Sequence, residues 1–207
     1  MVRFKNRHLL VEFLNLSTCS PTVSGTVSAL PISPTAGFTD PDDEDDELSP
    51  IPPLPFLVPG HDPTSARLKL GDEGGGHIFR VIRSVIQEVF GDEGWARVAS
   101  SFKIIYHSPA TTLTIVRVSR QHYRLVWAGI TLLTSINGLA VLPRVVAVSG
   151  TIKKLQNRAV GYHRLVTGQM VMAAVERAGI SVSATGEHQE LERKWAKEVA
   201  EIESLED

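Results

Sequence analysis

The sequence predicts an α+β protein built around one antiparallel sheet. Short runs rich in β-branched residues alternate with segments whose apolar residues repeat at helical spacing. Their order is strand, helix, strand, strand, helix, strand, followed by further helices. This is the split βαβ pattern of ferredoxin-like and RRM-like sandwiches, with a four-stranded, mainly antiparallel sheet and two helices on one face. We expect a third helix to cover the other face or one end.

Four segments carry the pattern of strands, and these are residues 9–14, 102–107, 111–118 and 139–149. The second and third are joined by a turn at Ser108, Pro109 and Ala110. Pro143 lies inside the last segment, where it is tolerated near the start of a strand or on a sheet edge.

The clearest helix covers residues 78–90, and Gly91 follows it as a stop. Ser119 is expected to cap a second helix over residues 120–136, which the turn signal Asn137-Gly138 ends. A third helix spans residues 151–178, in which Gly161 and Gly168 mark a weak point or a break. The tail is a candidate for one more helix, because four apolar residues would fall on one side of it: Leu191, Trp195, Val199 and Ile202.

Composition divides the chain into four parts. Residues 1–16 are a basic arm with the first strand, residues 67–180 are the rest of the α+β domain, and residues 181–207 are an acidic tail. Residues 17–66 hold ten of the twelve prolines and no periodic apolar pattern. Such a segment buries too little surface to offset its ordering entropy, so we predict that this insert is disordered.

The net charge of -2 conceals an uneven distribution. Residues 17–66 contain eight acidic residues and no Lys or Arg, and residues 186–207 contain eight acidic residues and three basic ones. The remaining chain has 18 Lys and Arg against seven Asp and Glu. A basic body with acidic appendages is typical of a protein that binds a polyanion, although some of these cations are ordinary solvated charge.

Two groups of residues are candidates for contact with RNA phosphates. The first is the N-terminal arm, with Arg3, Lys5, Arg7 and His8 directly before the first strand; ordinary solubilising charge explains it equally well. The second is the start of the third helix, where a strand hands over to a helix N-terminus and cations lie on one side. Its members are Gly150, Thr151, Lys153, Lys154, Asn157, Arg158 and Arg164. The apolar positions Ile152, Leu155 and Tyr162 should face the sheet.

Several other kinds of site find no support in the sequence. Cys19 is the only cysteine, which excludes a disulfide framework and a cysteine-based zinc site within this chain. The glycine-rich segment 71–76 lacks the Lys-Ser/Thr of a P-loop. The seven histidines are scattered, no catalytic constellation is visible, and no membrane span is expected. Tyr123 and Trp127 are interpreted as core residues.

Three motifs resemble the Pop-type small α/β subunit shared by eukaryotic ribonuclease P and ribonuclease MRP. Residues 1–10 read MVRFKNRHLL, residues 122–127 read HYRLVW, and residues 149–152 read SGTI. The family usually opens with Met-Val-Arg-Phe-Lys-x-Arg-Tyr-Leu-Leu, carries a Tyr-x-Leu-Val-Trp helix, and has a Gly-Gly-Thr-Ile turn before its basic helix. His8, Ser149 and the long insert depart from this pattern, and the insert leaves the function of that loop open.

The resemblance implies a protein subunit that supports a catalytic RNA in the removal of tRNA 5′ leaders and in rRNA processing. The RNA would be the catalyst and would carry the Mg²⁺, so we expect no intrinsic catalytic site and no cofactor on the protein. The implied partners are that RNA, a TIM-barrel-like protein subunit, other particle proteins and, as a further candidate, precursor tRNA. The implied location is the nucleus and nucleolus. An RNA-binding assembly factor of another ribonucleoprotein and a small α+β enzyme are the alternative functions.

Overall fold

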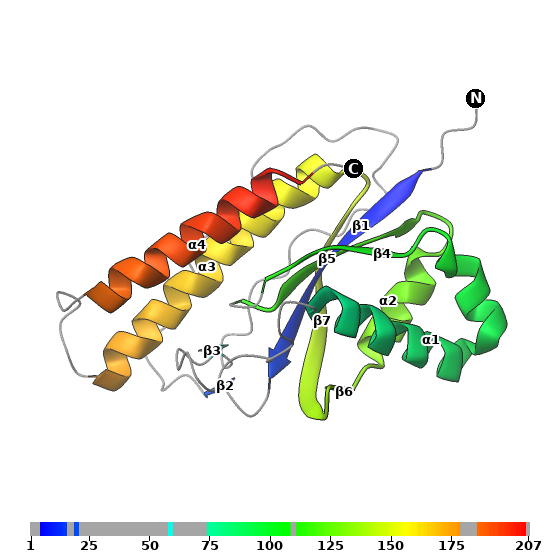
Figure 1. Cartoon of the computed structure of the whole chain (residues 1–207), viewed down its shortest axis with the longest axis horizontal. Coiled ribbons are helices and arrows are strands. Elements are labelled where there is room, and N and C mark those ends of the chain that lie inside the picture. The colour runs from blue at the N-terminus through cyan, green and yellow to red at the C-terminus, as the bar shows by residue number, and fades with distance from the viewer. Residues whose placement is uncertain are drawn as a thin grey trace.

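The structure, a computed structural model, describes residues 5–15, 19–20, 58–59, 74–108, 111–178 and 186–205. Its centre is a five-stranded sheet in the order β4-β5-β1-β7-β6, with every neighbouring pair antiparallel (Figure 1). The strands are β1 (Asn6–Asn15), β4 (Lys103–His107), β5 (Leu113–Ser119), β6 (Ser135–Ile136) and β7 (Leu139–Ser149). The four long strands have the order expected of the ferredoxin-like split βαβ pattern, which confirms the predicted fold class.

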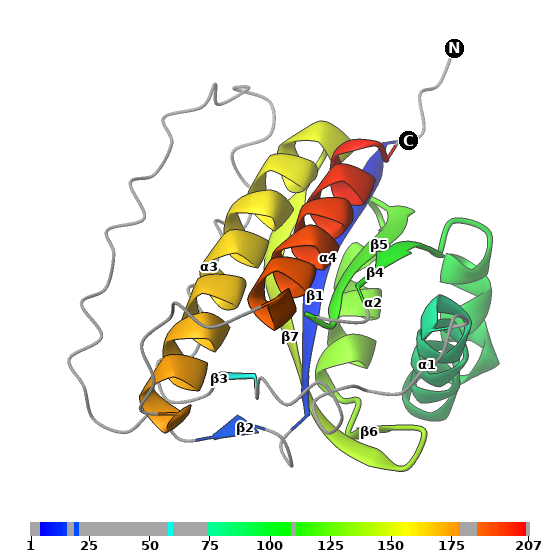
Figure 2. The ribbon, with the colours of Figure 1, turned by 60° about the vertical axis from the view of Figure 1, so that its left-hand side comes forward.

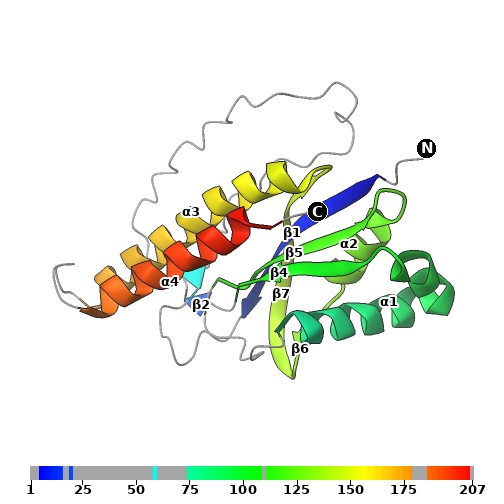
Figure 3. The same cartoon turned by 45° about the horizontal axis from the view of Figure 1, so that its top comes forward.

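Two helices cover each face of this sheet (Figure 3). One face carries α1 (Gly74–Ala99) and α2 (Tyr123–Thr131), as predicted. The other carries α3 (Ile152–Ala178) and α4 (Gly186–Glu203), which lie side by side and run in opposite directions (Figures 1 and 2). The third helix therefore covers the second face, one of the two predicted positions.

Alternation along β1 explains how one strand serves two hydrophobic cores, because successive side chains of a strand point to opposite faces. Leu9 and Phe13 are fully buried in the α1–α2 core, and Leu10 is fully buried in the α3–α4 core. The α1–α2 core also contains Val11, Ile78, Ile82, Ile86, Val116, Val126 and Ile130. The α3–α4 core also contains Leu113, Ile115, Ala147, Leu155, Ala159, Tyr162, Val166 and Ile202.

Glycines shape the α1–α2 layer at two places. Gly91 has φ 70°, a left-handed conformation that glycine adopts without steric cost, and it interrupts α1. The predicted stop at Gly91 is therefore correct, but a helical segment that the prediction lacked continues to Ala99. Gly129 lies against Ile86: a Cβ at position 129 would stand 2.6 Å from Ile86 Cγ1. The absence of a side chain lets α2 approach α1 closely.

A tight turn adds the fifth strand, which the four-stranded prediction lacked. Asn137 and Gly138 have φ of 50° and 77°, the paired left-handed conformation of a two-residue hairpin turn. The turn pairs Ser135 and Ile136 with the start of β7, so α2 ends at Thr131 and not near residue 136. The predicted start of α2 was also wrong. Ser119 lies in β5, and His122 occupies the N-cap position without a side-chain cap.

The other helices agree with prediction more closely. α3 runs without interruption through Gly161 and Gly168, so the possible break does not occur there. α4 confirms the helix in the tail, with Ile202 fully buried and Trp195 and Val199 half-buried.

Most of the predicted insert 17–66 lies outside the described residues, as do Pro109 and Ala110 of the predicted turn. Two dipeptides of the insert are described. β2 (Cys19–Ser20) pairs antiparallel with β3 (Val58–Pro59), in a small ladder separate from the main sheet. Disorder of the remaining insert stays a prediction.

Candidate nucleic-acid interface

The first turns of α3 have the two faces that the sequence predicts. Leu155 and Tyr162 are buried against the sheet, whereas Lys153, Asn157 and Arg164 are exposed. The first turn contains no acidic residue. The helix therefore presents positive charge to solvent at the end where its macrodipole is also positive.

Arg158 and Lys154 differ from the exposed cations because both are half-buried. The guanidinium Nη1 of Arg158 donates to the carbonyl oxygen of Val148 at 3.0 Å. Arg158 thus ties α3 to the end of β7, and its substitution would change folding as well as charge. These two candidate contact residues are therefore less accessible than Lys153 and Arg164.

The backbone donors at the start of α3 are partly used within the protein. The Thr151 amide donates to Ser149 Oγ at 3.3 Å, and the Lys154 amide donates to Thr151 Oγ1 at 3.4 Å. These are side-chain caps of the usual helix N-terminal kind. The expectation that Gly150 and Thr151 present a set of free amides to phosphate is therefore too simple, although Thr151 itself is exposed.

The predicted N-terminal arm is placed differently from expectation. Arg3 lies outside the described residues, and Lys5 is exposed directly before β1. β1 begins at Asn6, so Arg7 and His8 are strand residues, with 3% and 0% of their surface exposed. The prediction that these two side chains extend ahead of the strand is wrong. The pairing of β1 with both β5 and β7 extends further toward the N-terminus than the apolar run indicates.

Strand pairing brings His8 into a row of polar side chains that the sequence alone does not reveal. Lys103 of β4 is opposite Arg117 of β5, Arg117 is opposite His8, and His8 is opposite Ser149 of β7. Directly opposed residues of antiparallel strands point to the same face. Leu10, Ile115 and Ala147 belong to the α3–α4 core. His8, Arg117 and Ser149 are each two residues away from one of them on the same strand, so the row lies on the α3–α4 face as well. Lys103 and Arg117 are the residues that sequence reasoning missed.

Three arginines that are alternative candidates for RNA contact lie elsewhere. Arg80 and Arg83 are on α1, and Arg124 is on α2, on the opposite side of the sheet from α3. The guanidinium of Arg83 lies 5.4 Å from the ring centre of Trp95, and that of Arg124 lies 5.9 Å from the ring of Tyr123. Tyr123 and Trp127 pack within or against the α1–α2 core, as predicted.

A buried polar cluster ties α3 to the sheet beneath the exposed cations. Glu12 is 2% exposed; Tyr162 Oη donates to its Oε2 at 2.9 Å, and Arg144 Nη1 donates to the same oxygen at 3.3 Å. Burial raises the pKa of Glu12 above its usual value, against the lowering effects of Tyr162 and then Arg144. Burial likewise raises the pKa of the Tyr162 hydroxyl, so Tyr162 remains a hydrogen-bond donor.

Polar contacts also hold α4 on α3. His163 Nε2 lies 2.9 Å from Glu198 Oε2, and both side chains are largely buried. The side-chain amide of Gln156 donates to the Leu205 carbonyl at 2.6 Å and approaches the Glu203 carbonyl at 3.5 Å. The C-terminal end of α4 is therefore fixed beside the second turn of α3.

Within the described part of the chain, no group of His, Cys, Asp and Glu side chains is arranged to hold a metal ion. Among the same residues, no helix combines the length and the apolarity that crossing a bilayer requires. The feature that stands out is thus the basic start of α3 and the polar row beside it.

Comparison with known proteins gives a consistent family assignment. The sequence model of the Rpp14/Pop5 family matches residues 39–160, more than half of the chain. The protein named "Ribonuclease P/MRP protein subunit POP5" of Schizosaccharomyces pombe is 49% identical over 83 residues, which are 40% of this chain and 60% of that protein.

Two proteins named "Probable ribonuclease P/MRP protein subunit POP5" also match over 83 residues, 40% of this chain. The one from Dictyostelium discoideum is 34% identical, with 48% of its length matched, and the one from Arabidopsis thaliana is 35% identical, with 55% matched. The match thus spans less than two thirds of each of the three relatives. A chain in the structure titled "Cryo-EM structure of yeast Ribonuclease MRP" aligns with a TM-score of 0.37 at 8% identity, over 73% of this chain and 79% of that one. From the extent of the family match, the chain belongs to the Rpp14/Pop5 family.

Proposed function

We propose that this chain is a non-catalytic protein subunit of ribonuclease P and ribonuclease MRP that supports the catalytic RNA in tRNA 5′-leader removal and rRNA processing. The observation that carries the proposal is that a member of the Rpp14/Pop5 family presents exposed cations, Lys153 and Arg164, on a helix whose other side is anchored in the core. The names of its relatives as ribonuclease P/MRP subunits agree with this.

The proposed contribution of the protein is electrostatic. Cations held on a rigid helix neutralise RNA phosphates and release condensed counterions, which stabilises one arrangement of the RNA. Cleavage and its Mg²⁺ belong to the RNA in this proposal. A TIM-barrel-like subunit is the proposed protein neighbour, and the nucleus and nucleolus are the proposed location.

The first test is to sequence RNA crosslinked to the full chain in cells. The RNA components of ribonuclease P and MRP should be the main species recovered. A different dominant RNA would favour an assembly factor of another particle. Processing of precursor tRNA by the purified protein after nuclease treatment would favour an enzyme.

The second test uses charge reversal on α3. Lys153→Glu with Arg164→Glu should weaken binding to the particle RNA and reduce the log–log salt slope by about 0.7–0.9 for each phosphate that the variant no longer neutralises. Exposed charges contribute little to stability, so the thermal midpoint should stay nearly constant. The matched control reverses two exposed cations outside α3, Arg193→Glu with Lys194→Glu on α4. Equally weakened binding in both double variants would show that net charge, and not α3, governs binding.

A further inference from the structure

The polar row across the sheet continues the basic start of α3. The row crosses four strands and ends at Ser149. The hydroxyl of Ser149 accepts a hydrogen bond from the amide of Thr151, the residue directly before α3. Lys103 at its far end is exposed, Arg117 is half-buried, and His8 is fully buried beneath them. Three inter-strand spacings of about 4.8 Å give this row a length of about 14 Å. His8 and Ser149 are fully buried, so the row itself offers phosphate only Lys103 and Arg117, and the start of α3 lies at its other end.

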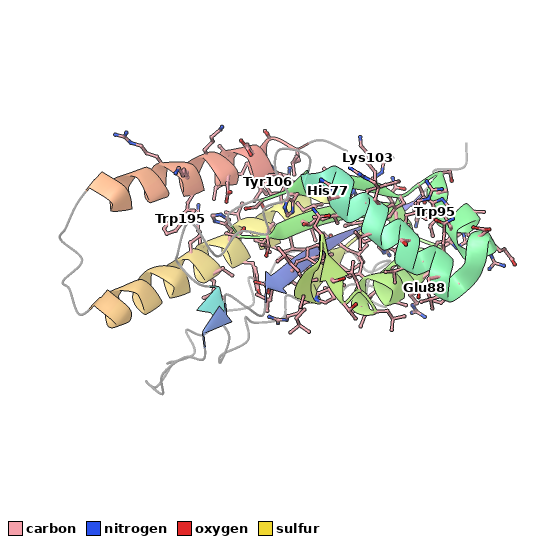
Figure 4. The ribbon with its side chains drawn as sticks, turned by 60° about the horizontal axis from the view of Figure 1, so that its bottom comes forward. His77, Glu88, Trp95, Lys103, Tyr106 and Trp195 are labelled. Atoms are coloured by element: carbon pink, nitrogen blue, oxygen red, sulfur yellow. The ribbon has the colours of Figure 1, made fainter. Side chains whose placement is uncertain are left out.

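The end of α4 lies at this same end of the molecule. Its last turn contains no basic residue, while Glu201 and Glu203 are exposed there. Gln156 fixes the carbonyls of Glu203 and Leu205 beside α3. Figure 4 shows Lys103 and Tyr106 toward this same end of α4.

Two physical features give the C-terminal end of α4 a negative electrostatic potential. A helix C-terminus carries the negative end of the macrodipole, and the carboxylates of Glu201 and Glu203 add to it. Its influence reaches the sheet, because burial first, and then Glu198 and Glu201, raise the pKa of Tyr106 on β4. The negatively charged end of α4 therefore lies close to the positively charged start of α3 and to the polar row beside it.

We propose that Lys103, Arg117 and the start of α3 form one phosphate-binding strip for RNA, and that the acidic end of α4 lowers the affinity of this strip. The inference rests on the proposed function. It adds that Lys103 and Arg117 of the sheet also bind RNA phosphate, and that the acidic end of α4 competes with the RNA for these cations. Arg117 is half-buried and Lys103 is exposed, so Lys103 is the residue through which the strip is best tested.

The test measures binding of the full chain to the RNA component of ribonuclease P over a range of salt concentrations. Lys103→Gln should reduce the log–log salt slope by about 0.7–0.9, the contribution of one phosphate. Lys103→Arg, which keeps the charge, should retain the slope. Lys194→Gln is the matched control, since Lys194 is an exposed lysine on the N-terminal half of α4.

The second arm removes the competitor. Glu201→Gln with Glu203→Gln should tighten binding about two- to fourfold at low salt, and the gain should shrink as salt screens it. The control is Glu93→Gln with Glu88→Gln on α1. Glu93 pairs with Arg97 four residues on, just as Glu201 pairs with Lys197 four residues back, so both double variants remove one ion pair of the same kind.

The outcomes separate the inference from the proposed function. An unchanged slope for Lys103→Gln, or equal tightening in both glutamate pairs, would overturn the strip while α3-dependent binding still supports the proposed function. If wild-type protein shows no salt-dependent binding to this RNA and the α3 variants change nothing, the proposed function itself is wrong.

Discussion

The two faces of the sheet are closed by different chemistry. On the α1–α2 face, Ile78, Ile82 and Ile86 of α1 meet an apolar surface of the sheet. On the α3–α4 face, the apolar core surrounds the buried Glu12, and the buried pair of His163 and Glu198 joins the two helices. The first face therefore depends mainly on apolar burial, whereas the second also depends on buried polar groups that must keep their partners.

This difference explains why exposed cations accumulate on the outer surface of α3. A helix held to the sheet by polar contacts and by Arg158 can carry charge around its outer surface, as α3 does with Lys153 and Arg164. The α1–α2 face carries exposed charge too, but there the described arginines lie over aromatic rings or beside their own helix.

The largest effect should come from cavities, and it should be similar on both faces. Ile82→Ala in the α1–α2 core and Leu155→Ala in the α3–α4 core each remove a fully buried side chain, so each should reduce the free energy of unfolding by about 2–5 kcal/mol. Chemical denaturation with urea measures both. A small reduction for Leu155→Ala alone would mean that α3 is loosely held.

The next effect is a dependence of stability on pH, to which His107 on β4 and Glu12 on β1 contribute in opposite senses. Burial lowers the pKa of His107 on β4 from 6.5 to about 4. Between these values the unfolded chain binds more protons, so stability is complete above pH 6.5 and is lost as pH falls toward 4, by on the order of 2–3 kcal/mol at about 1.4 kcal/mol per unit. Glu12 acts in the opposite sense, because its raised pKa favours the folded state as pH falls.

His107→Gln isolates the histidine contribution. Urea denaturation between pH 4 and 7 should show a flatter decline of stability in this variant than in the wild type. His77→Gln on α1 is the matched control for the change from histidine to glutamine itself. Identical profiles for the wild type and His107→Gln would assign the pH dependence to other groups.

The smallest of the three effects compares two tyrosines. Tyr162→Phe removes the hydroxyl that donates to buried Glu12 and should cost about 1–3 kcal/mol, because the buried carboxylate loses one of its two donors and keeps only Arg144. Tyr123→Phe on the other face removes a hydroxyl that accepts from Arg124 at 3.3 Å in a partly buried setting. It should cost less than Tyr162→Phe. Thermal midpoints measured at pH 7 decide the order.

The elements of this fold were largely predictable because they depend on local patterns. The helical spacing of residues 78–90 and the long apolar run of β7 are sufficient to assign a helix and a strand from sequence alone. The start of β1 was not predictable, because Arg7 and His8 look like arm residues until the neighbouring strands are known.

In the candidate site too, features set by local sequence patterns were predictable and features set by strand pairing were not. The exposed and buried sides of α3 were predictable from helical periodicity, as Lys153 and Leu155 show. The row through Lys103 and Arg117 was not, since it depends on register between strands and on irregularities after Leu10 and Ile104. The role of Arg158 required knowing that its guanidinium reaches the Val148 carbonyl.

The close approach of α2 to α1 also limits how this protein can vary. Ile86 already occupies the space that any side chain at position 129 would need. A methyl group at position 129 is acceptable only together with a smaller residue at position 86, so the two substitutions are coupled although the positions are far apart in sequence. A side chain at position 129 alone would be strained against Ile86, whereas a smaller residue at position 86 alone would leave only a cavity. The pair is therefore expected to change in a fixed order, with position 86 reduced first.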